Sequence, residues 1–280
     1  MKTNLFTAII ILNYNTFEDT INCVESVERY NTTPIKYIVV DNGSSREGVV
    51  DSLDRFFKRM FCDRYLRINE FDDVIGELPR MTFLISKNNS GYADGNNKGL
   101  KLADSDNSID KILVLNNDIL FVQDIIPGLI EDLDSLKDCG IVSPILYKRN
   151  LKDLDYNCAR TNVTVWQMIY KNFFFYLYVL LKKKINSHNL ILLNNKVNIG
   201  KEIMQIELPS GSCMLIRKDL FKHIGYFDSR TFLYYEENIL YKKLLAQKKI
   251  NYLDTRYKCI HLGASSTRKS PSLFIVKKGR

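Results

Sequence analysis

The chain has 280 residues, and its 40 lysines and arginines against 32 aspartates and glutamates give a net charge of +8 at pH 7. Hydrophobic residues make up 45% of it and charged residues 26%, a balance typical of a globular protein with a substantial core. This composition excludes a disordered chain, a collagen and a coiled coil. The positive charge leaves nucleic acid, an anionic membrane and phosphorylated small molecules as partner classes.

The first half of the sequence predicts alternating strands and helices. Apolar runs typical of strands covered on both faces occur at residues 7–12 (TAIIIL), 37–40 (YIVV), 82–85 (TFLI) and 111–115 (KILVL). Apolar residues at helical spacing predict helices over residues 19–30, 48–59 and 91–103. Such alternation predicts an α/β fold with a mostly parallel central sheet flanked by helices.

The second half is less regular. Residues 151–200 are rich in asparagine and lysine, and they contain an aromatic run at 173–181 (FFFYLYVLL) followed by three lysines at 182–184. Further on, we expect an apolar run, two helices and a strand at residues 207–216, 218–224, 236–247 and 250–253. Residues 268–280 carry five basic side chains and no acid.

The cysteines and the apolar runs indicate a cytoplasmic protein. None of the six cysteines forms a C-x-x-C pair, so neither a zinc site nor a redox dithiol is predicted. The N-terminal apolar run is short and lacks a small-residue cleavage site, which argues against a signal peptide. No stretch reaches the roughly 18 uncharged apolar residues of a transmembrane helix.

Polar clusters follow three of the predicted strands, where a parallel sheet places its ligands. They comprise Asn13 and Asn15, then Asp41 and Ser44, and finally Asn116, Asn117 and Asp118. Asp118 suits a Mg²⁺ or Mn²⁺ ion shared with substrate phosphates, and Asp41 suits hydrogen bonds from a nucleobase. Each cluster taken alone is equally compatible with an ordinary Asx turn.

Gly91 opens a glycine-bearing helix start, GYADGNNKG. Its backbone N–H groups could face a diphosphate, and Asn96 and Asn97 could reach ribose or phosphate. The glycine spacing differs from the dinucleotide fingerprint and does not follow the first strand, which argues against a Rossmann dehydrogenase.

Two adjacent carboxylates, Glu236 and Glu237, follow four residues (FLYY) and open a predicted helix. One can face a cleft as a general base while the other caps the helix, and a carboxylate among aromatics has a raised proton affinity. The competing interpretation is that both merely favour a helix N-terminus. His261 is a candidate nitrogen ligand for a metal, although a lone histidine is usually structural.

Seven motifs occur in the order NYN, DNGSS, GYADGNNKGL, LNND, SGSCMLIRKDLFKHIGYFD, FLYYEENILYKKL and IHLGASST. Together they resemble the family 2 glycosyltransferases of the GT-A fold, particularly the bacterial rhamnosyltransferase-like branch that builds surface polysaccharides such as O-antigen or capsule. The resemblance covers about residues 6–267 and is weakest at 151–200. It implies an inverting, metal-dependent hexosyltransferase that uses a nucleoside-diphosphate sugar and a glycan acceptor.

The resemblance also implies roles for individual residues. Nucleotide-sugar contacts are implied at Asn13, Asn15, Asp41, Ser44, Gly91, Asn96, Asn97, Asn116, Asn117 and Gly211. Asp118 and His261 match the residues that hold a divalent ion, Mg²⁺ or Mn²⁺. Glu237 falls where the family usually has the Asp that deprotonates the acceptor, and Glu236 precedes it.

The chain departs from the family at its E-D-x-D-L motif, which reads EENIL here. The base is one methylene longer, and Ile239 replaces the later acid. An impaired nucleotide-sugar-binding or scaffold component of a polysaccharide assembly complex is therefore the alternative function. A nucleotidyltransferase would need a glycine-rich basic loop after the first strand, where this chain has the acidic, glycine-free NYNTFED. The sequence contains no known nucleic-acid-binding motif, which argues against nucleic-acid binding.

The resemblance divides the chain into one catalytic domain at residues 1–267 and a basic tail at 268–280. Within the domain we expect a nucleotide-binding half (1–150), a variable insert (151–200) and an acceptor half (201–267). The aromatic run and lysines of the insert either bind the anionic inner face of the cell membrane, near a lipid-linked acceptor, or form a buried helix.

Overall fold

The computed structural model of the protein describes residues 5–72, 74, 76–162, 166, 170, 173 and 201–263. The lysines at 182–184, the basic tail and most of the aromatic run lie outside the described residues. The strands are β1 (Phe6–Asn13), β2 (Ile35–Asp41), β3 (Tyr65–Asn69), β4 (Met81–Ile85), β5 (Ile109–Asn116), β6 (Ile119–Phe121), β7 (Cys139–Lys148), β8 (Ala159–Arg160), β9 (Ile203–Ile206), β10 (Leu208–Pro209), β11 (Cys213–Arg217) and β12 (Ile250–His261). The helices are α1 (Phe17–Tyr30), α2 (Val49–Phe61), α3 (Gly91–Asp104), α4 (Ile126–Ser135), α7 (Lys218–His223) and α8 (Glu236–Ala246), with single turns η1 (Cys62–Arg64) and η2 (Tyr156–Cys158).

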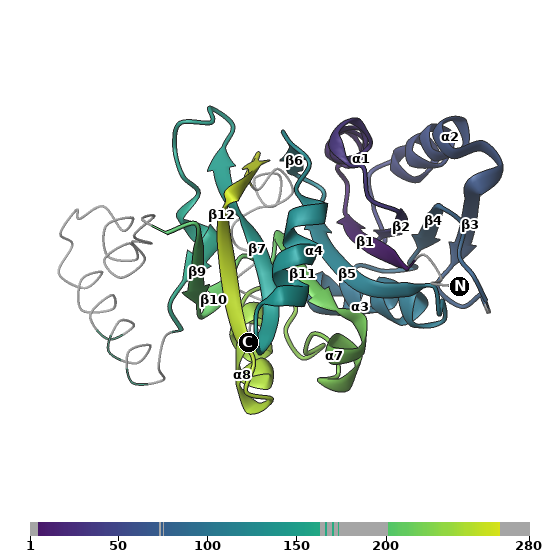
Figure 1. The fold of residues 1–280 in the computed structure, drawn as a ribbon. Coiled ribbons are helices and arrows are strands. Elements are labelled where there is room, and N and C mark those ends of the chain that lie inside the picture. Colours follow the sequence, from purple (N-terminus) through teal and green to yellow (C-terminus); the bar gives the residue numbers. More distant parts are fainter. Residues whose placement is uncertain are drawn as a thin grey trace.

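A ten-stranded sheet forms the centre of the molecule, in the order β3-β4-β2-β1-β5-β11-β7-β12-β6, with β9 paired to β12 (Figure 1). Strands β3, β4, β2, β1 and β5 run parallel to one another, and the sequence predicts all of them except β3. β11 runs antiparallel to both of its neighbours, and β6 and β9 run antiparallel to β12. β8 and β10 form a separate small ladder. The predicted α/β class with a mostly parallel sheet is confirmed.

Helices bury both faces of the sheet, which explains why its inner strands read as continuous apolar runs. Successive side chains of a strand point to opposite faces. Ile9 and Ile11 of β1 belong to the core cluster that includes α1, α2 and α4, whereas Ile10 belongs to the cluster that includes α3, α7 and α8.

β12 extends well beyond the predicted strand at residues 250–253 and ends at His261. Charged residues interrupt its apolar pattern after Leu253, and the pairing with β7 shifts register between Asp254 and Lys258. The continuation pairs His261 with Ile119 of β6, one residue from Asp118. No pattern in the sequence predicts β3, β6, β7, β9 or α4 either. This long strand is what carries the histidine to the site.

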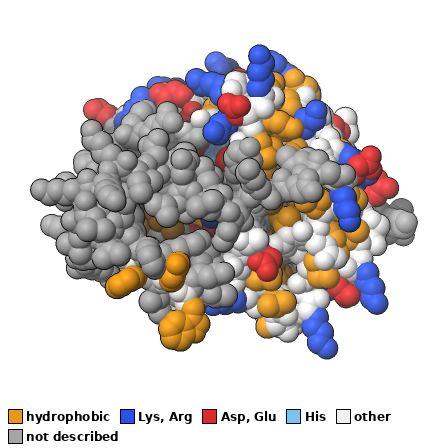
Figure 2. All heavy atoms as spheres, turned by 90° about the vertical axis from the view of Figure 1, so that its left-hand side faces the viewer, with side chains coloured by type: hydrophobic (Ala, Val, Ile, Leu, Met, Phe, Trp, Pro, Cys, Tyr) orange, Lys and Arg blue, Asp and Glu red, His pale blue; other side chains and the backbone are white. Residues whose placement is uncertain are grey.

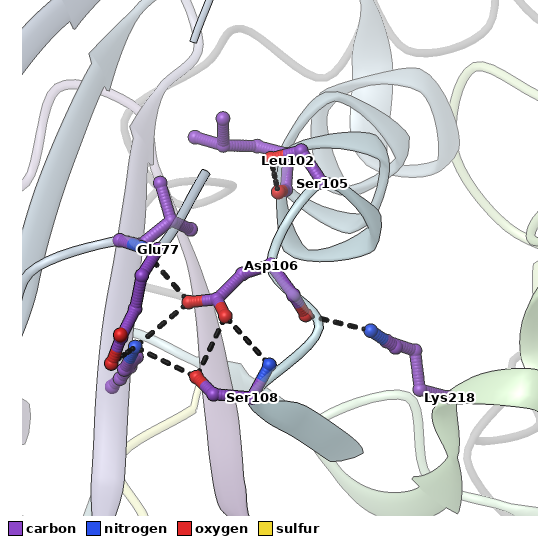
Figure 3. Close-up of polar contacts among 8 residues, drawn as sticks. Glu77, Leu102, Ser105, Asp106, Ser108 and Lys218 are labelled. Atoms are coloured by element: carbon purple, nitrogen blue, oxygen red, sulfur yellow. Dashed lines mark hydrogen bonds and ion pairs between the residues drawn. The ribbon is translucent and has the colours of Figure 1, made fainter. Parts of the chain in front are cut away.

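A buried ion pair lies where β2 and β5 begin, and Figure 3 shows the polar contacts around its Asp106. Lys36 and Asp106 are only 3% and 1% exposed, and Lys36 Nζ lies 2.8 Å from Asp106 Oδ2. The carboxylate also accepts hydrogen bonds from the backbone N–H groups of Leu78 and Ser108. Lys218 donates to the backbone carbonyl of Asp106. The pair therefore joins β2, the end of α3 and the start of β5 and α7.

Replacing Asp106 with alanine should destabilise the protein by about 3–5 kcal/mol, because it removes the buried carboxylate from Lys36 and leaves only the exposed Glu77 and the Ser108 hydroxyl. Urea denaturation measures this loss. The matched control is Asp110→Ala, which removes the partly exposed pair of Asp110 with Lys111 and should cost about 1 kcal/mol or less. Equal losses in the two variants would contradict the importance of the buried pair.

No helix within the described ranges is long and apolar enough to cross a membrane.

Candidate active site

A row of polar side chains begins where β1 and β2 end. Asn13 donates from Nδ2 to Oδ1 of Asp41 over 2.7 Å, and both residues are buried. Ser44 donates to the same carboxylate from its backbone N–H and its hydroxyl, at 3.0 and 2.5 Å. The hydroxyl of Ser44 accepts from the backbone N–H of Asn15 at 2.9 Å. The four residues predicted to read the nucleoside thus form one cluster that fixes the carboxylate of Asp41.

Asn116 and Asn117 connect this cluster to the rest of the sheet. Asn117 Nδ2 donates to the hydroxyls of Thr16 and Thr20, at 2.8 and 3.0 Å. The Thr20 hydroxyl in turn donates to Asn13. Asn116 Nδ2 donates the other way, to the Ser212 hydroxyl at 3.2 Å. Consecutive amides of the LNND motif therefore reach both sides of β5.

Asp118 and His261, predicted as metal ligands, lie together. Nε2 of His261 is 3.4 Å from Oδ2 of Asp118, and Nδ1 is 2.5 Å from Oδ2 of Asp155. Burial alone would lower the pKa of His261, but hydrogen bonds to the two carboxylates outweigh it and raise the pKa to about 10. The described part of the chain holds no group of three or more His, Cys, Asp or Glu side chains that could bind a metal. Asp118 and His261 are thus a two-residue candidate.

Glu237 lies at the start of α8 and is held against the loop that precedes β11. Gly211 donates from its backbone N–H to Glu237 Oε1 over 3.1 Å, and a Cβ on Gly211 would come within 2.7 Å of that oxygen. The Tyr92 hydroxyl donates to the carbonyl of Gly211 at 2.6 Å. Arg160 NH2 lies 3.3 Å from the same carboxylate oxygen. A side chain at position 211 would push the Glu237 carboxylate away, so the structure gives Gly211 a contact with the candidate base.

Glu236 differs from its neighbour. It is 3% exposed, and its Oε1 has no hydrogen-bond partner among the described residues. Burial raises the pKa of Glu236 from its ordinary value near 4.5 to about 7, and the nearby charge of Glu237 adds to the increase. Glu237 keeps 18% of its side chain exposed. Of the two predicted catalytic carboxylates, Glu237 is therefore the one that an acceptor can reach.

The buried carboxyl group of Glu236 should make stability depend on pH. Because its pKa is higher in the folded protein than in the unfolded chain, it stays protonated longer when folded, and stability falls as pH rises from about 4.5 to 7. Replacing Glu236 with glutamine should flatten the melting temperature over this range relative to the unmodified chain. Parallel curves for the two proteins would contradict the assignment.

The residues of α3 form contacts within the protein. The backbone N–H groups of Gly91 and Tyr92 donate to Asn89 Oδ1 and the carbonyl of Phe232, so they are already used. Asn97 bonds to both backbone groups of Phe227. The diphosphate and ribose contacts expected at Gly91 and Asn97 stay predictions.

Asn96 keeps a buried acceptor without a partner. Its Nδ2 donates to the carbonyl of Tyr92, while its Oδ1 has no hydrogen-bond partner among the described residues. The donor contact expected of Asn96 stays a prediction.

Asp155 and Arg160 were missed by the sequence reasoning. They lie in an irregular stretch without a motif, and only the tertiary structure brings them to His261 and Glu237. Asp155 also caps η2, accepting from the N–H of Asn157 at 3.0 Å. One short segment thus touches both the candidate metal ligand and the candidate base.

Residues 8–225 match the family described as Glycosyl transferase family 2. The chain belongs to this family. Its members are glycosyltransferases, and the site described above coincides with the motifs that indicated the family.

A curated relative is the low-salt glycan biosynthesis hexosyltransferase Agl10 of Haloferax volcanii, 26% identical over 231 residues. The match covers 82% of this chain but only 58% of the relative's length. The rhamnosyltransferase-like branch expected from the motifs finds no support in this match.

Among solved structures, the crystal structure of GalNAc-T7 with UDP, GalNAc and Mn²⁺ superposes with a TM-score of 0.61 at 12% identity. The match covers 93% of this chain and 44% of that one. At this identity the likeness concerns the fold, and it confirms the GT-A fold.

Proposed function

We propose that the protein transfers a hexosyl residue from a nucleoside-diphosphate sugar to a glycan acceptor, with inversion at the anomeric carbon. One observation carries this proposal: Asn117 contacts the nucleoside cluster, Asn116 contacts Ser212 next to the Gly211 that bonds to Glu237, and Asp118 directly follows these two asparagines. The name of the Agl10 relative supports glycan biosynthesis and a hexose donor. Rhamnose, a deoxyhexose, is one donor to test among several.

Different residues of the site would bind the base, the diphosphate and the sugar of the donor. Asn13, Asn15 and Ser44 hold the Asp41 carboxylate so that it can accept a hydrogen bond from a nucleobase. Asn116 and Asn117 lie between this cluster and Asp118, where the ribose and diphosphate would pass. The backbone at Gly211 would pass close to the sugar beside Glu237.

The residues present fit a divalent ion. His261 uses one ring nitrogen for Asp155 and turns the other toward Asp118, as metal-binding histidines do with a supporting carboxylate. Asp118 and His261 would hold the ion, and phosphate oxygens would supply further ligands. When bound, the ion would neutralise charge that develops on the leaving diphosphate.

Glu237 is the proposed general base. It would take the proton of the acceptor hydroxyl as that oxygen attacks the anomeric carbon from the face opposite the diphosphate. This single displacement inverts the configuration. Arg160 and the N–H of Gly211 hold the carboxylate in place before the acceptor arrives.

We propose a lipid-linked acceptor and peripheral membrane binding through the insert at residues 151–200. Trp166, Tyr170 and Phe173 are helical residues spaced on one helix face, and they are 81%, 63% and 62% exposed. Exposed hydrophobic side chains are visible at the lower left of the face in Figure 2. Aromatic rings of this kind favour the membrane interface. Flotation with anionic liposomes tests this proposal. Binding that is unchanged by both added salt and a Trp166→Ser substitution would contradict it.

A thermal-shift panel of nucleotide sugars with Mn²⁺ or Mg²⁺ tests the donor, because selective binding raises the melting temperature. Release of nucleoside diphosphate from the stabilising donor then tests transfer. Stabilisation without release or transfer would favour the alternative function, a nucleotide-sugar-binding scaffold of an assembly complex. No stabilisation by any donor would contradict both.

Asp155→Asn should weaken Mn²⁺ binding by about 10- to 100-fold, because the amide no longer fixes the orientation and tautomer of His261. Titration calorimetry with Mn²⁺ measures this directly. Asp153→Asn is the control, since among the described residues the side chain of Asp153 bonds only to Asn150. Unchanged Mn²⁺ affinity in Asp155→Asn would show that the carboxylate has no role in the metal site.

A further inference from the structure

The segment directly before the candidate base adopts an unusual backbone. Tyr234 and Tyr235 have φ values of +76° and +71°, so two successive bulky residues occupy the left-handed region. Side chains with a Cβ are disfavoured there, and glycine is the residue that adopts it freely. Their aromatic rings are 54% and 55% exposed. The described residues supply neither ring with a hydrogen bond or a ring contact.

Contacts on both sides fix this segment. The carbonyl of Phe232 accepts from the N–H of Tyr92 at 2.9 Å, and Gly91 must lack a Cβ because that carbonyl lies 2.3 Å from where the atom would be. On the other side, the carbonyl of Tyr235 accepts from the N–H of Ile239 in the first turn of α8. The surrounding structure therefore imposes the strained conformation, and the tyrosine rings contribute little to holding it.

Tyr226 shows what a structural tyrosine with the same backbone looks like. Its φ is +55°, but its ring packs against Phe221 at 5.8 Å and its hydroxyl bonds to Asp104. Packing of that kind offsets the strain within the fold. Tyr234 and Tyr235 lack such contacts, and backbone strain that no packing offsets is typical of functional sites.

The position of the two rings indicates which ligand they suit. They precede Glu237 by three and two residues, in the segment that leads into α8, so their backbone lies close to the candidate base. A pyranose presents a face of C–H groups that packs on an aromatic ring, and the phenol hydroxyl can bond to ring hydroxyls. An exposed aromatic pair beside a general base thus fits a sugar.

We propose that Tyr234 and Tyr235 form a platform for the acceptor sugar, placing a pyranose ring so that its hydroxyl meets Glu237. This inference rests on the proposed function of the site. The acceptor-binding side of the site would then be the strained segment at Tyr234 and Tyr235. The group recognised there would be a pyranose instead of a peptide or a bare lipid phosphate.

Glycine substitutions separate binding from folding. Tyr234→Gly and Tyr235→Gly should each raise the melting temperature by about 2–4 °C, because glycine relieves the positive φ. The same variants should raise the acceptor KM at least about tenfold in transfer to a panel of p-nitrophenyl hexosides. Tyr234→Phe and Tyr235→Phe keep the ring and should restore KM to within about threefold of the unmodified protein. Tyr226→Gly, the control, should lower the melting temperature.

Thermal stabilisation by the nucleotide sugar distinguishes a failure of the proposed function from a failure of the tyrosine platform. If no donor stabilises the protein and none is turned over, the proposed function itself fails. If the unmodified protein transfers sugar and the glycine variants keep its acceptor KM, the platform is refuted. Loss of donor stabilisation in the glycine variants would also refute it, since the segment would then shape the donor site instead.

Discussion

Replacing Glu237 with glutamine should reduce sugar transfer by about 10²- to 10⁴-fold, the usual contribution of a general base. Glutamine keeps the size of the side chain and can still accept the hydrogen bond from Gly211, so the fold and the donor site should be preserved. Rates of nucleoside diphosphate release with saturating donor and acceptor measure the effect. Thermal stabilisation by the donor, measured in parallel, should stay as in the unmodified protein.

Glu236→Gln is the matched control for this experiment. Glu236 is enclosed, and an acceptor cannot reach its Oε1 without movement of the segment. We expect Glu236→Gln to retain transfer within about tenfold while changing the pH dependence of stability. If Glu236→Gln were inactive and Glu237→Gln nearly fully active, the roles of the two carboxylates would be reversed.

Replacing Asp118 with asparagine should abolish measurable Mn²⁺ binding and reduce transfer by about 10³-fold. A metal ion supplies several kcal/mol of charge stabilisation at a leaving phosphate, and each 1.4 kcal/mol corresponds to a factor of ten in rate. The neutral amide also removes the only carboxylate that faces Nε2 of His261 among the described residues. Calorimetry with Mn²⁺ and transfer assays measure the two effects separately.

Free nucleoside provides the control for Asp118→Asn. The cluster around Asp41 shares no side chain with Asp118, so protection by a nucleoside without phosphates should be unchanged. Asp41→Asn should show the opposite pattern, with weaker nucleoside binding and unaltered Mn²⁺ affinity. If Asp118→Asn retained full Mn²⁺ affinity and transfer, the metal would have to be held elsewhere or be unnecessary.

The parallel half of the fold was predictable because its signals are local. Residues 7–12 read as a buried strand, and β1 spans Phe6–Asn13 with helices on both faces. The exits of neighbouring parallel strands meet at one edge, so Asn13, Asp41 and Asp118 could be expected near one another before the structure was known. The motif order then indicated the family that residues 8–225 match.

The second half shows where local signals fail. After Leu253, the charged residues Asp254, Arg256 and Lys258 break the apolar pattern, so the sequence does not indicate that β12 continues. The strand continues because its pairing with β7 and β6 stabilises it despite these charges. In α3, Gly91 lies against Phe232 and Asn97 bonds to Phe227, contacts that no local pattern indicates.

The sequence by itself determined the α/β class, the family and the chemical types at the site, since these depend on short runs and motifs of neighbouring residues. Only the tertiary structure decided that Asp155 supports His261, that Arg160 and Gly211 hold Glu237, and that Tyr234 and Tyr235 are strained and exposed. Those contacts join residues 26 to 106 positions apart. Long-range pairing of this kind depends on how the strands are ordered in the sheet, which no local pattern records.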